Sequence, residues 1–462
     1  MRTPTSITRR SSRALSAILL AVFLSAWGAL GLRQDGGAGG GRDQDAPPAR
    51  TAADTIHGSR PLAGTPAPRG GSSMLTSMAD LQAHLRDNPG DYVGWATLGM
   101  DYIQHAKAAT DPAYYPKAEG VLRRSLAVSP QDDFVAMAGM GALEAARHNF
   151  TEALSWAQRA AAIDPYNSTV YGILGDAYTQ LGRYPQAYQA IQRMVDLEPG
   201  TPSLARASYT WELRGDLAEA TADMQRALAD ASTPADRAFT RYYLAELAFN
   251  AGDPHAALAH DLAGLRETPG DAALLEGKAK AEAALGDTAS AIADYRRAVG
   301  LVPQPQYVVE LGELYESVGD SGNAKQEYQL FRAEEQLFAS NGVTLDTDPT
   351  LFNADHGDPG EALKYGKAGI KIRPFVEMDD AYGWALHKNG RDREALAFVR
   401  KATSTGMRSA LFHFHLGIIE AGLGDRDGAR TDLAAALRIN PHFNPLQAPV
   451  ARTMLARLEA KR

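Results

Sequence analysis

The chain has 462 residues, of which 45% are hydrophobic and 22% are charged, and its formal net charge is −8. This acidic balance supplies no basic face for phosphate groups, so we expect no nucleic acid partner. The chain contains no cysteine, which excludes disulfide bonds and thiol chemistry. It is rich in alanine and lacks the alternation of apolar and polar residues that marks strands, so we expect an all-α protein.

An apolar stretch follows four arginines near the N-terminus. From Ala14 to Leu32 only Ser16 and Ser25 have polar side chains. A helix of this length spans about 28 Å, close to the hydrocarbon thickness of a bilayer. Residues 1–33 are therefore interpreted as a signal peptide or membrane anchor, and the length of the stretch favours the anchor. The positive charges precede the stretch, which predicts that the rest of the chain lies outside the cytoplasm.

Residues 34–73 are rich in glycine and proline and contain almost no large apolar side chain. Such a stretch cannot bury enough surface to fold, so we expect a disordered linker. A flexible chain of this length reaches about 35 Å, which would hold the rest of the protein away from a membrane.

Small residues recur along the rest of the chain with a period of about 34 residues. The alanines that define the period are Ala118, Ala153, Ala187, Ala220, Ala257, Ala291, Ala324, Ala362, Ala395 and Ala429. Eight of them have a glycine five residues earlier, namely Gly182, Gly215, Gly252, Gly286, Gly319, Gly357, Gly390 and Gly424. Because glycine can end a helix and let the chain reverse, each unit is predicted to be two helices joined by a tight turn.

The first helix of the first unit carries a recognisable motif. Trp95, Leu98, Gly99 and Tyr102 reproduce the pattern of Trp, two residues, Leu-Gly, two residues and Tyr, and the same frame recurs at Tyr171. The chain therefore resembles the tetratricopeptide repeat (TPR) family, of the bacterial exported or membrane-anchored type, from about residue 75 to its C-terminus. The resemblance implies a right-handed α-solenoid of about ten helix-turn-helix repeats with capping helices.

A break in the period divides the array. Residues 74–340 are expected to form a half-repeat cap and seven repeats, and residues 341–462 three repeats and a capping helix. Before the break, a long helix is predicted to continue through Phe338. After it, Asp348 is predicted to be the N-cap of the next helix, because a proline follows it at the first helical position.

Motifs that would indicate catalysis are absent from the sequence. There is no Gly-rich phosphate loop followed by Lys-Ser or Lys-Thr, and no His-Glu-x-x-His helix. His413 and His415 are two residues apart and do not share a helix face, so we do not expect them to hold one metal ion. We therefore expect no catalytic, cofactor-binding or metal site.

TPR proteins generally bind partners on the concave surface of the solenoid, which the resemblance assigns to the fifth, ninth and twelfth places of each first helix. The candidate partner-binding residues are Tyr209, Glu212, Tyr242, Glu246, Phe249, Glu313, Glu316, Asp380, Trp384 and His387. Aromatic side chains beside carboxylates suit an extended peptide with apolar and basic side chains. The alternative is that the aromatic residues of this set pack between adjacent repeats.

These patterns together predict a non-enzymatic scaffold for protein or peptide partners. It is expected to be exported and tethered to the cell membrane through Ala14 to Leu32, or secreted if the signal is cleaved. A role in the assembly of envelope proteins rests on family analogy alone. Two alternatives stay open: a regulatory TPR protein on the cytoplasmic side, and an enzyme with an unrecognised site.

Overall fold

The structure is a computed structural model that describes residues 70–460, with side chains from Leu75 onward. The predicted signal or anchor and residues 34–69 of the predicted linker lie outside the described residues. None of the helices in the described part is long and apolar enough to cross a membrane.

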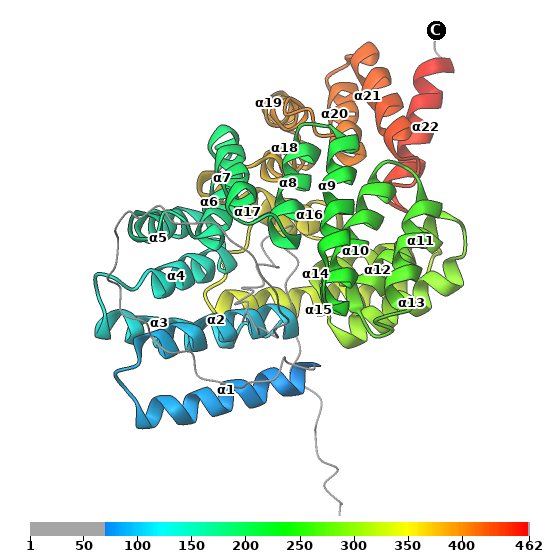
Figure 1. Ribbon diagram of the computed structural model, residues 1–462. Coiled ribbons are helices and arrows are strands. Elements are labelled where there is room, and N and C mark those ends of the chain that lie inside the picture. Colours follow the sequence, from blue (N-terminus) through cyan, green and yellow to red (C-terminus); the bar gives the residue numbers. More distant parts are fainter. Residues whose placement is uncertain (1–69, 461–462) are drawn as a thin grey trace, which may run out of the picture.

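Residues 70–460 form 22 helices and no strand (Figure 1). Ten helix pairs follow one another between a first helix, α1 (Gly70–Asp87), and a last helix, α22 (Gln447–Ala460). The first helices of the pairs are α2 (Tyr92–Ala109), α4 (Phe134–Ala146), α6 (Ser168–Gln180), α8 (Thr201–Leu213), α10 (Pro234–Asn250), α12 (Ala272–Ala284), α14 (Pro305–Ser317), α16 (Thr347–His356), α18 (Val376–Lys388) and α20 (Ala410–Gly422). The second helices are α3 (Tyr114–Val128), α5 (Phe150–Ile163), α7 (Tyr184–Leu197), α9 (Leu217–Asp230), α11 (Pro254–Leu265), α13 (Thr288–Leu301), α15 (Ser321–Ser340), α17 (Pro359–Ile372), α19 (Asp392–Thr403) and α21 (Arg426–Ile439). The predicted all-α solenoid of about ten repeats is confirmed.

Small residues allow the two helices of a pair to approach closely. All ten alanines that define the period lie on second helices, and each is at most 3% exposed. On the first helices, glycines play the matching role: a Cβ added at Gly175 of α6 would lie 2.5 Å from Cγ1 of Ile191 on α7. A larger side chain at these places would overpack the pair.

The turn inside most pairs is made by the glycine that precedes the alanine. Seven of the eight predicted turn glycines have a positive φ, from 66° at Gly182 to 90° at Gly286. Gly357 differs, because its backbone is extended with φ −130°. In the second repeat His148 takes the equivalent place and adopts φ 62° without being a glycine.

The break between the seventh and eighth repeats differs from the prediction in one detail. Helix α15 continues through Phe338 as predicted, but Asp346, rather than Asp348, is the N-cap of α16. Its Oδ1 accepts a hydrogen bond from the backbone N–H of Thr347 at 2.5 Å. The prediction failed because Asp346 also pairs with two distant side chains, which place the start of α16 two residues earlier.

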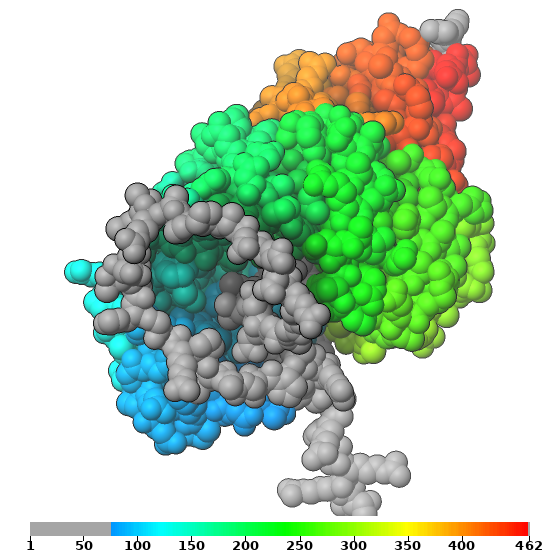
Figure 2. Space-filling view, viewed as in Figure 1, coloured from blue at the N-terminus to red at the C-terminus, as the bar shows by residue number. Residues whose placement is uncertain are grey.

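The solenoid winds so far that its later repeats lie against earlier ones (Figures 1 and 2). We call the earlier repeats the first turn of the superhelix and the later repeats its second turn. Three turn glycines contact the loops that follow α17 and α19 and the C-terminal end of α21. The contacting pairs are Gly182 with Pro374, Gly215 with Gly406, and Gly252 with Ile439. A Cβ added at any of these three glycines would lie only 2.1 to 2.6 Å from a carbonyl oxygen of the second turn. Backbone therefore touches backbone between the two turns.

A buried cluster of polar side chains connects the two turns of the superhelix near the contact of Gly182 with Pro374. We call it the inter-turn ion cluster. Arg373 donates to Asp346 Oδ1 at 2.8 Å and to Gln180 Oε1 at 2.7 Å, and His148 Nδ1 lies 3.2 Å from Asp346 Oδ2. Burial alone would raise the pKa of Asp346, but Arg373 and His148 hold that pKa well below its usual range. Arg373 and Gln180 are 193 residues apart in the sequence. The cluster therefore ties the end of α17 to the end of α6.

The turn glycines allow a matched test of this contact. Gly215 and Gly319 have similar backbones, with φ 77° and 81°, but only Gly215 faces another backbone. Both Gly215→Ala and Gly319→Ala should suffer the strain of a positive φ. Gly215→Ala should lose about 1–3 kcal/mol more, because its Cβ also overpacks the second turn. Denaturant unfolding of both variants measures the difference, and equal losses would contradict the packing of the two turns.

Candidate functional site

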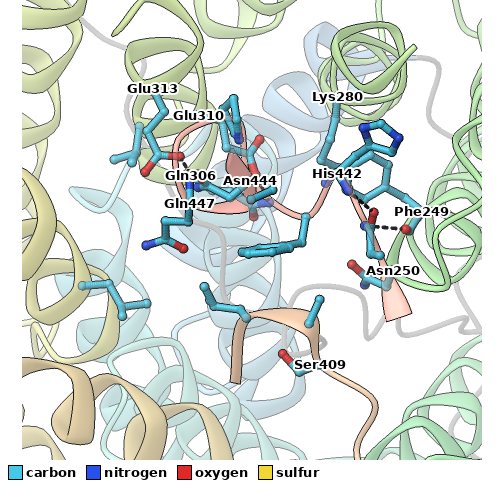
Figure 3. A pocket seen from close by; sticks show the side chains of 18 of the residues that line it. Phe249, Asn250, Lys280, Gln306, Glu310, Glu313, Ser409, His442, Asn444 and Gln447 are labelled. Carbon is cyan, nitrogen blue, oxygen red and sulfur yellow. Dashed lines mark hydrogen bonds between the residues drawn. The ribbon is translucent and has the colours of Figure 1, made fainter. Parts of the chain in front are cut away.

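The winding of the solenoid forms a cavity of about 600 Å³ that is partly open to solvent. Its walls come mainly from the first helices α8, α10, α12, α14, α16, α18 and α20, which face the axis of the superhelix. Figure 3 shows side chains from several of these helices around a common space. The volume lies within the range of small-molecule and peptide side-chain pockets.

The non-helical residues 440–446, together with Gln447 at the start of α22, form one wall of this cavity. We call residues Asn440–Gln447 the Asn-Pro segment, because it contains two Asn-Pro pairs four residues apart. Each asparagine accepts a hydrogen bond from the backbone two residues later: Asn440 from His442 and Asn444 from Leu446, both at 2.8 Å. These local turns, and the prolines, keep the segment out of a helix.

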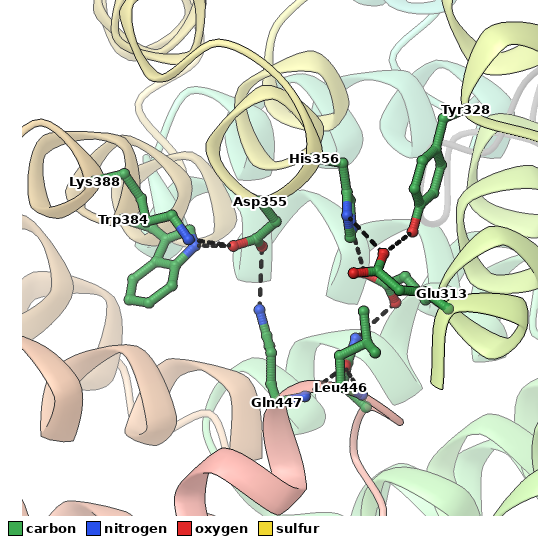
Figure 4. Close-up of polar contacts among 10 residues, drawn as sticks. Glu313, Tyr328, Asp355, His356, Trp384, Lys388, Leu446 and Gln447 are labelled. Atoms are coloured by element: carbon green, nitrogen blue, oxygen red, sulfur yellow. Dashed lines mark hydrogen bonds and ion pairs between the residues drawn. The ribbon is translucent and has the colours of Figure 1, made fainter. Parts of the chain in front are cut away.

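The side-chain amides of the Asn-Pro segment donate to three different helices, α10, α14 and α16. The donor and acceptor pairs are Asn440 with the Phe249 carbonyl (2.8 Å), Asn444 with Glu313 (2.7 Å) and Gln447 with Asp355 (3.1 Å). Figure 4 shows Gln447 beside Asp355, and Glu313 next to His356. The chain's own segment thus lies in the superhelix interior in the manner of a bound peptide.

Glu313 is shared between the Asn-Pro segment and a histidine of α16. His356 Nε2 lies 3.0 Å from Glu313 Oε1, and the His356 ring stacks on Tyr328 with centroids 4.5 Å apart. Burial alone would lower the pKa of His356, but Glu313 raises it above the usual value. When protonated, this imidazole compensates the carboxylate that anchors Asn444.

Carboxylates outnumber basic side chains in the cavity wall. The carboxylates are Glu212, Glu246, Glu310, Glu313, Asp348, Asp355, Glu377 and Asp380. The lysine and arginines are Lys280, Arg373, Arg408 and Arg452. The aromatic side chains are Phe249, Tyr295, Phe331, Phe352, Phe412 and Phe443. The interior is therefore acidic and apolar at once.

Lys280 neutralises the part of the wall formed by α10 and α12. Its Nζ lies 2.6 Å from Glu246 Oε1 and 2.9 Å from Glu276 Oε1, and 5.4 Å from the centre of the Phe249 ring. Burial alone would lower the pKa of Lys280, but the two glutamates raise it well above its usual value. Lys280 is therefore charged and already paired with these two glutamates.

Four carboxylates of the wall have no basic side chain within ion-pair distance in the described part of the chain, and Glu212 and Glu377 are two of them. Burial, together with Glu377 and Glu246, raises the pKa of Glu212 to about 8. Burial likewise raises the pKa of Glu377 to about 7, although Arg373 opposes the shift. Both groups would release their protons more readily beside a bound cation.

Half of the predicted partner-binding residues line the cavity. These are Glu212, Glu246, Phe249, Glu313 and Asp380. Two aromatic residues of the prediction instead pack between helices. Tyr209 is buried and donates to Glu377 Oε1 at 3.3 Å, and Trp384 stacks on His415 with centroids 4.1 Å apart. Tyr209 and Trp384 therefore have the packing role that was the alternative.

The other three predicted residues also lie away from the cavity wall. Tyr242 packs edge-on against Tyr243, with ring centroids 5.2 Å apart. Glu316 is exposed and accepts a hydrogen bond from Tyr328, and His387 Nδ1 lies 2.7 Å from Asp392 Oδ1. Whether any of the ten residues contacts a partner stays a prediction.

Sequence reasoning missed several residues of the wall, because they lie outside the three places considered in each first helix. Glu377 and His415 are examples on α18 and α20, and the Asn-Pro segment lies outside the repeats altogether. The two Asn-Pro pairs are the signal that could have indicated this segment, since each predicts a turn. Within the described residues, no group of three or more His, Asp or Glu side chains could hold a metal ion.

Comparisons with known proteins identify the repeats. Two sequence models described as tetratricopeptide repeat match residues 144–208 and residues 242–305. No curated protein matches the sequence.

Three solved structures illustrate what the chain resembles. A thermophilic TPR protein of Thermus thermophilus is 25% identical, with a TM-score of 0.34, over 37% of this chain and 91% of its own. The human IFIT1 dimer with PPP-AAAA is 17% identical, with a TM-score of 0.44, over 79% of this chain and 87% of its own. Yeast Tom70 is 13% identical, with a TM-score of 0.37, over 84% of this chain and 96% of its own.

The raised pKa of Glu377 predicts a pH-dependent stability. Its carboxyl is protonated in the folded state up to about pH 7 but ionises near pH 4.5 in the unfolded chain. The folded state therefore binds the extra proton, and this group lowers the stability as the pH rises from about 4.5 through about 7. Glu377→Gln should remove that loss and gain about 1–3 kcal/mol over the wild type at pH 8, with a smaller gain at pH 5.

Denaturant unfolding at pH 5 and pH 8 measures these gains. Glu361→Gln, at an exposed carboxylate of α17, serves as the matched control and should show no such change. A gain for Glu377→Gln that is the same at both pH values would contradict a desolvated Glu377 carboxyl without an ion-pair partner.

Proposed function

We propose that this tetratricopeptide repeat protein is a non-enzymatic scaffold that binds an extended, basic segment of a protein partner inside its superhelix. The partner segment would take the place of the Asn-Pro segment. The observation that carries the proposal is that the chain's own Asn-Pro segment already lies in the interior: its non-helical asparagines donate hydrogen bonds to α10 and α14, and Gln447, at the start of α22, donates to α16. A surface that holds one such segment can hold another of similar shape.

The charges of the interior favour a basic partner over the Asn-Pro segment. The segment contains no lysine or arginine, and its amides contact Glu313 and Asp355 as neutral donors. Lysine or arginine at the same places would form charge-assisted hydrogen bonds, which are stronger than neutral ones. The aromatic wall offers apolar contacts for the rest of the partner.

The scaffold is further proposed to be exported and held at the cell membrane. The support is the apolar stretch from Ala14 to Leu32 behind four arginines, followed by the Gly- and Pro-rich residues 34–73. The alternative, a regulatory protein on the cytoplasmic side, differs in the side of the membrane on which the repeats lie.

Membrane attachment can be tested by fractionation. The full-length chain should sediment with membranes and resist carbonate extraction, whereas a chain that starts at Gly70 should be soluble. Added protease should reach the repeats from the outer side of the membrane. Recovery of mature protein that begins between Gly28 and Arg33 would contradict the anchor, and protected repeats would favour the cytoplasmic alternative.

Release of the Asn-Pro segment should expose the binding surface. Asn440→Ala with Asn444→Ala removes two anchoring amides, so a partner peptide no longer has to displace them. A suitable probe is a fluorescent peptide with the sequence of residues 440–447, in which lysine replaces His442 and Leu446. Its affinity for the double variant should exceed that for the wild type at least tenfold, since about 1.4 kcal/mol of lost anchoring suffices for that factor.

The control for this experiment is Asn149→Ala, at an exposed asparagine on the turn before α5. It should bind the probe like the wild type. Adding Glu313→Lys to the double variant should weaken binding of the probe and reduce its dependence on salt. Equal affinity for the wild type and the double variant, without an effect of Glu313→Lys, would contradict binding in the interior.

A further inference from the structure

Three acceptor atoms that line the cavity are buried and have no hydrogen-bond partner among the described residues. They are Asp380 Oδ1, His415 Nε2 and Gln447 Oε1. Asp380 and His415 are 1% and 0% exposed. Burying an acceptor away from water without a donor is unfavourable. Only a group with N–H or O–H donors can form hydrogen bonds with these atoms.

The contact between the two buried residues determines the role of the imidazole. His415 Nδ1 lies 2.9 Å from Asp380 Oδ2, so this nitrogen carries the proton that is donated to the carboxylate. In the neutral imidazole, Nε2 is then left with a lone pair and is an acceptor. Trp384 stacks on the His415 ring at an interplanar angle of 14°, which holds the ring in place.

The basic side chains of the cavity wall are engaged elsewhere. Lys280 pairs with Glu246, Arg373 with Asp346, and Arg452 donates to the Pro441 carbonyl at 2.8 Å. Arg408, the fourth, is exposed.

A second carboxylate lies beside Asp380 on the same helix. Glu377 is three residues before Asp380 on α18, so the two side chains share one face of the helix, and both line the cavity. Glu377 has no lysine, arginine or histidine within ion-pair distance in the described part of the chain. Two carboxylates, one of which has an unpartnered oxygen, therefore lie together on one face of α18.

We propose that Glu377 and Asp380 form a binding site for an alkylammonium group whose apolar body lies against the aromatic side chains of the cavity, with His415 holding the Asp380 carboxylate through Oδ2. An ammonium carries a positive charge and N–H donors, which match the unpartnered Asp380 Oδ1 and the carboxylate of Glu377. The aromatic wall suits a hydrocarbon chain and adds cation–π attraction. The group can be the side chain of a partner's lysine, in which case the inference rests on the proposed function, or a free amine.

Calorimetric titration of the full-length protein in detergent can test this site with phenethylamine and its neutral counterpart 2-phenylethanol. At pH 7 the amine should bind at least tenfold more tightly than the alcohol. Glu377→Gln with Asp380→Asn should weaken amine binding at least tenfold, whereas Asp427→Asn, at an exposed carboxylate of α21, should leave it unchanged. Equal affinity for amine and alcohol, or unchanged binding by the double variant, would overturn the site.

The melting temperature of each variant separates lost binding from lost folding. If Asp380→Asn unfolds the repeat, Glu377→Gln alone replaces it, because this substitution keeps the contact between Asp380 and His415. It should weaken amine binding without lowering the melting temperature.

The source of the ammonium is distinguished with the lysine-containing peptide described above and its Nε-acetylated form, using the variant that lacks Asn440 and Asn444. If acetylation abolishes binding of the peptide, and Glu377→Gln abolishes it as well, the result would support a partner's lysine as the source of the ammonium. Binding of phenethylamine without binding of the peptide would support a free amine and count against the proposed function. A third outcome is that the peptide binds equally well after acetylation and to the Glu377→Gln variant, while phenethylamine does not bind. This would overturn the ammonium site but would not contradict the proposed function.

Discussion

Contact between the backbones of successive superhelical turns is the constraint on which the rest of the structure depends. At Gly182, Gly215 and Gly252, carbonyl oxygens of the second turn come so close that no Cβ would fit. The same glycines provide the positive φ that reverses the chain inside each helix pair. One residue type thus meets a local and a long-range requirement. Because both turns advance by repeats of nearly equal length, a contact at one repeat brings the next pair of repeats together as well.

Contact between the turns changes the concave surface into a cavity that is only partly open to solvent, and this explains its electrostatics. Carboxylates that would be hydrated in an open groove lose water inside the superhelix, which raises the pKa of Glu212 and Glu377. The Asn-Pro segment suits such a place, because Asn444 offers a neutral donor to Glu313 without adding a second charge that must be desolvated. A cationic group gains more from the same surroundings, and for that reason the cavity is the centre of both proposals.

Much of the fold could be predicted from the sequence, because the repeat is a local pattern. Ala187 and Gly182 report how two neighbouring helices pack and turn, and that geometry recurs in every unit. The winding could not be predicted, since it results from small rotations that add up over several repeats. The contact of Gly182 with Pro374 therefore escaped prediction, as did the N-cap at Asp346. Candidate residues on a first helix, such as Glu313, could be found from spacing alone, but their burial depends on the second turn.

The closed winding itself is tested most directly by a distance between the turns in solution. The chain has no native cysteine, so spin labels can be attached at cysteines introduced at two chosen positions. Glu219 and Ser404 are exposed and lie near the contact of Gly215 with Gly406, on opposite sides of it. Double electron–electron resonance should give a single, narrow, short distance between the two labels. A broad distribution at long distances would show an open solenoid and contradict the closed winding.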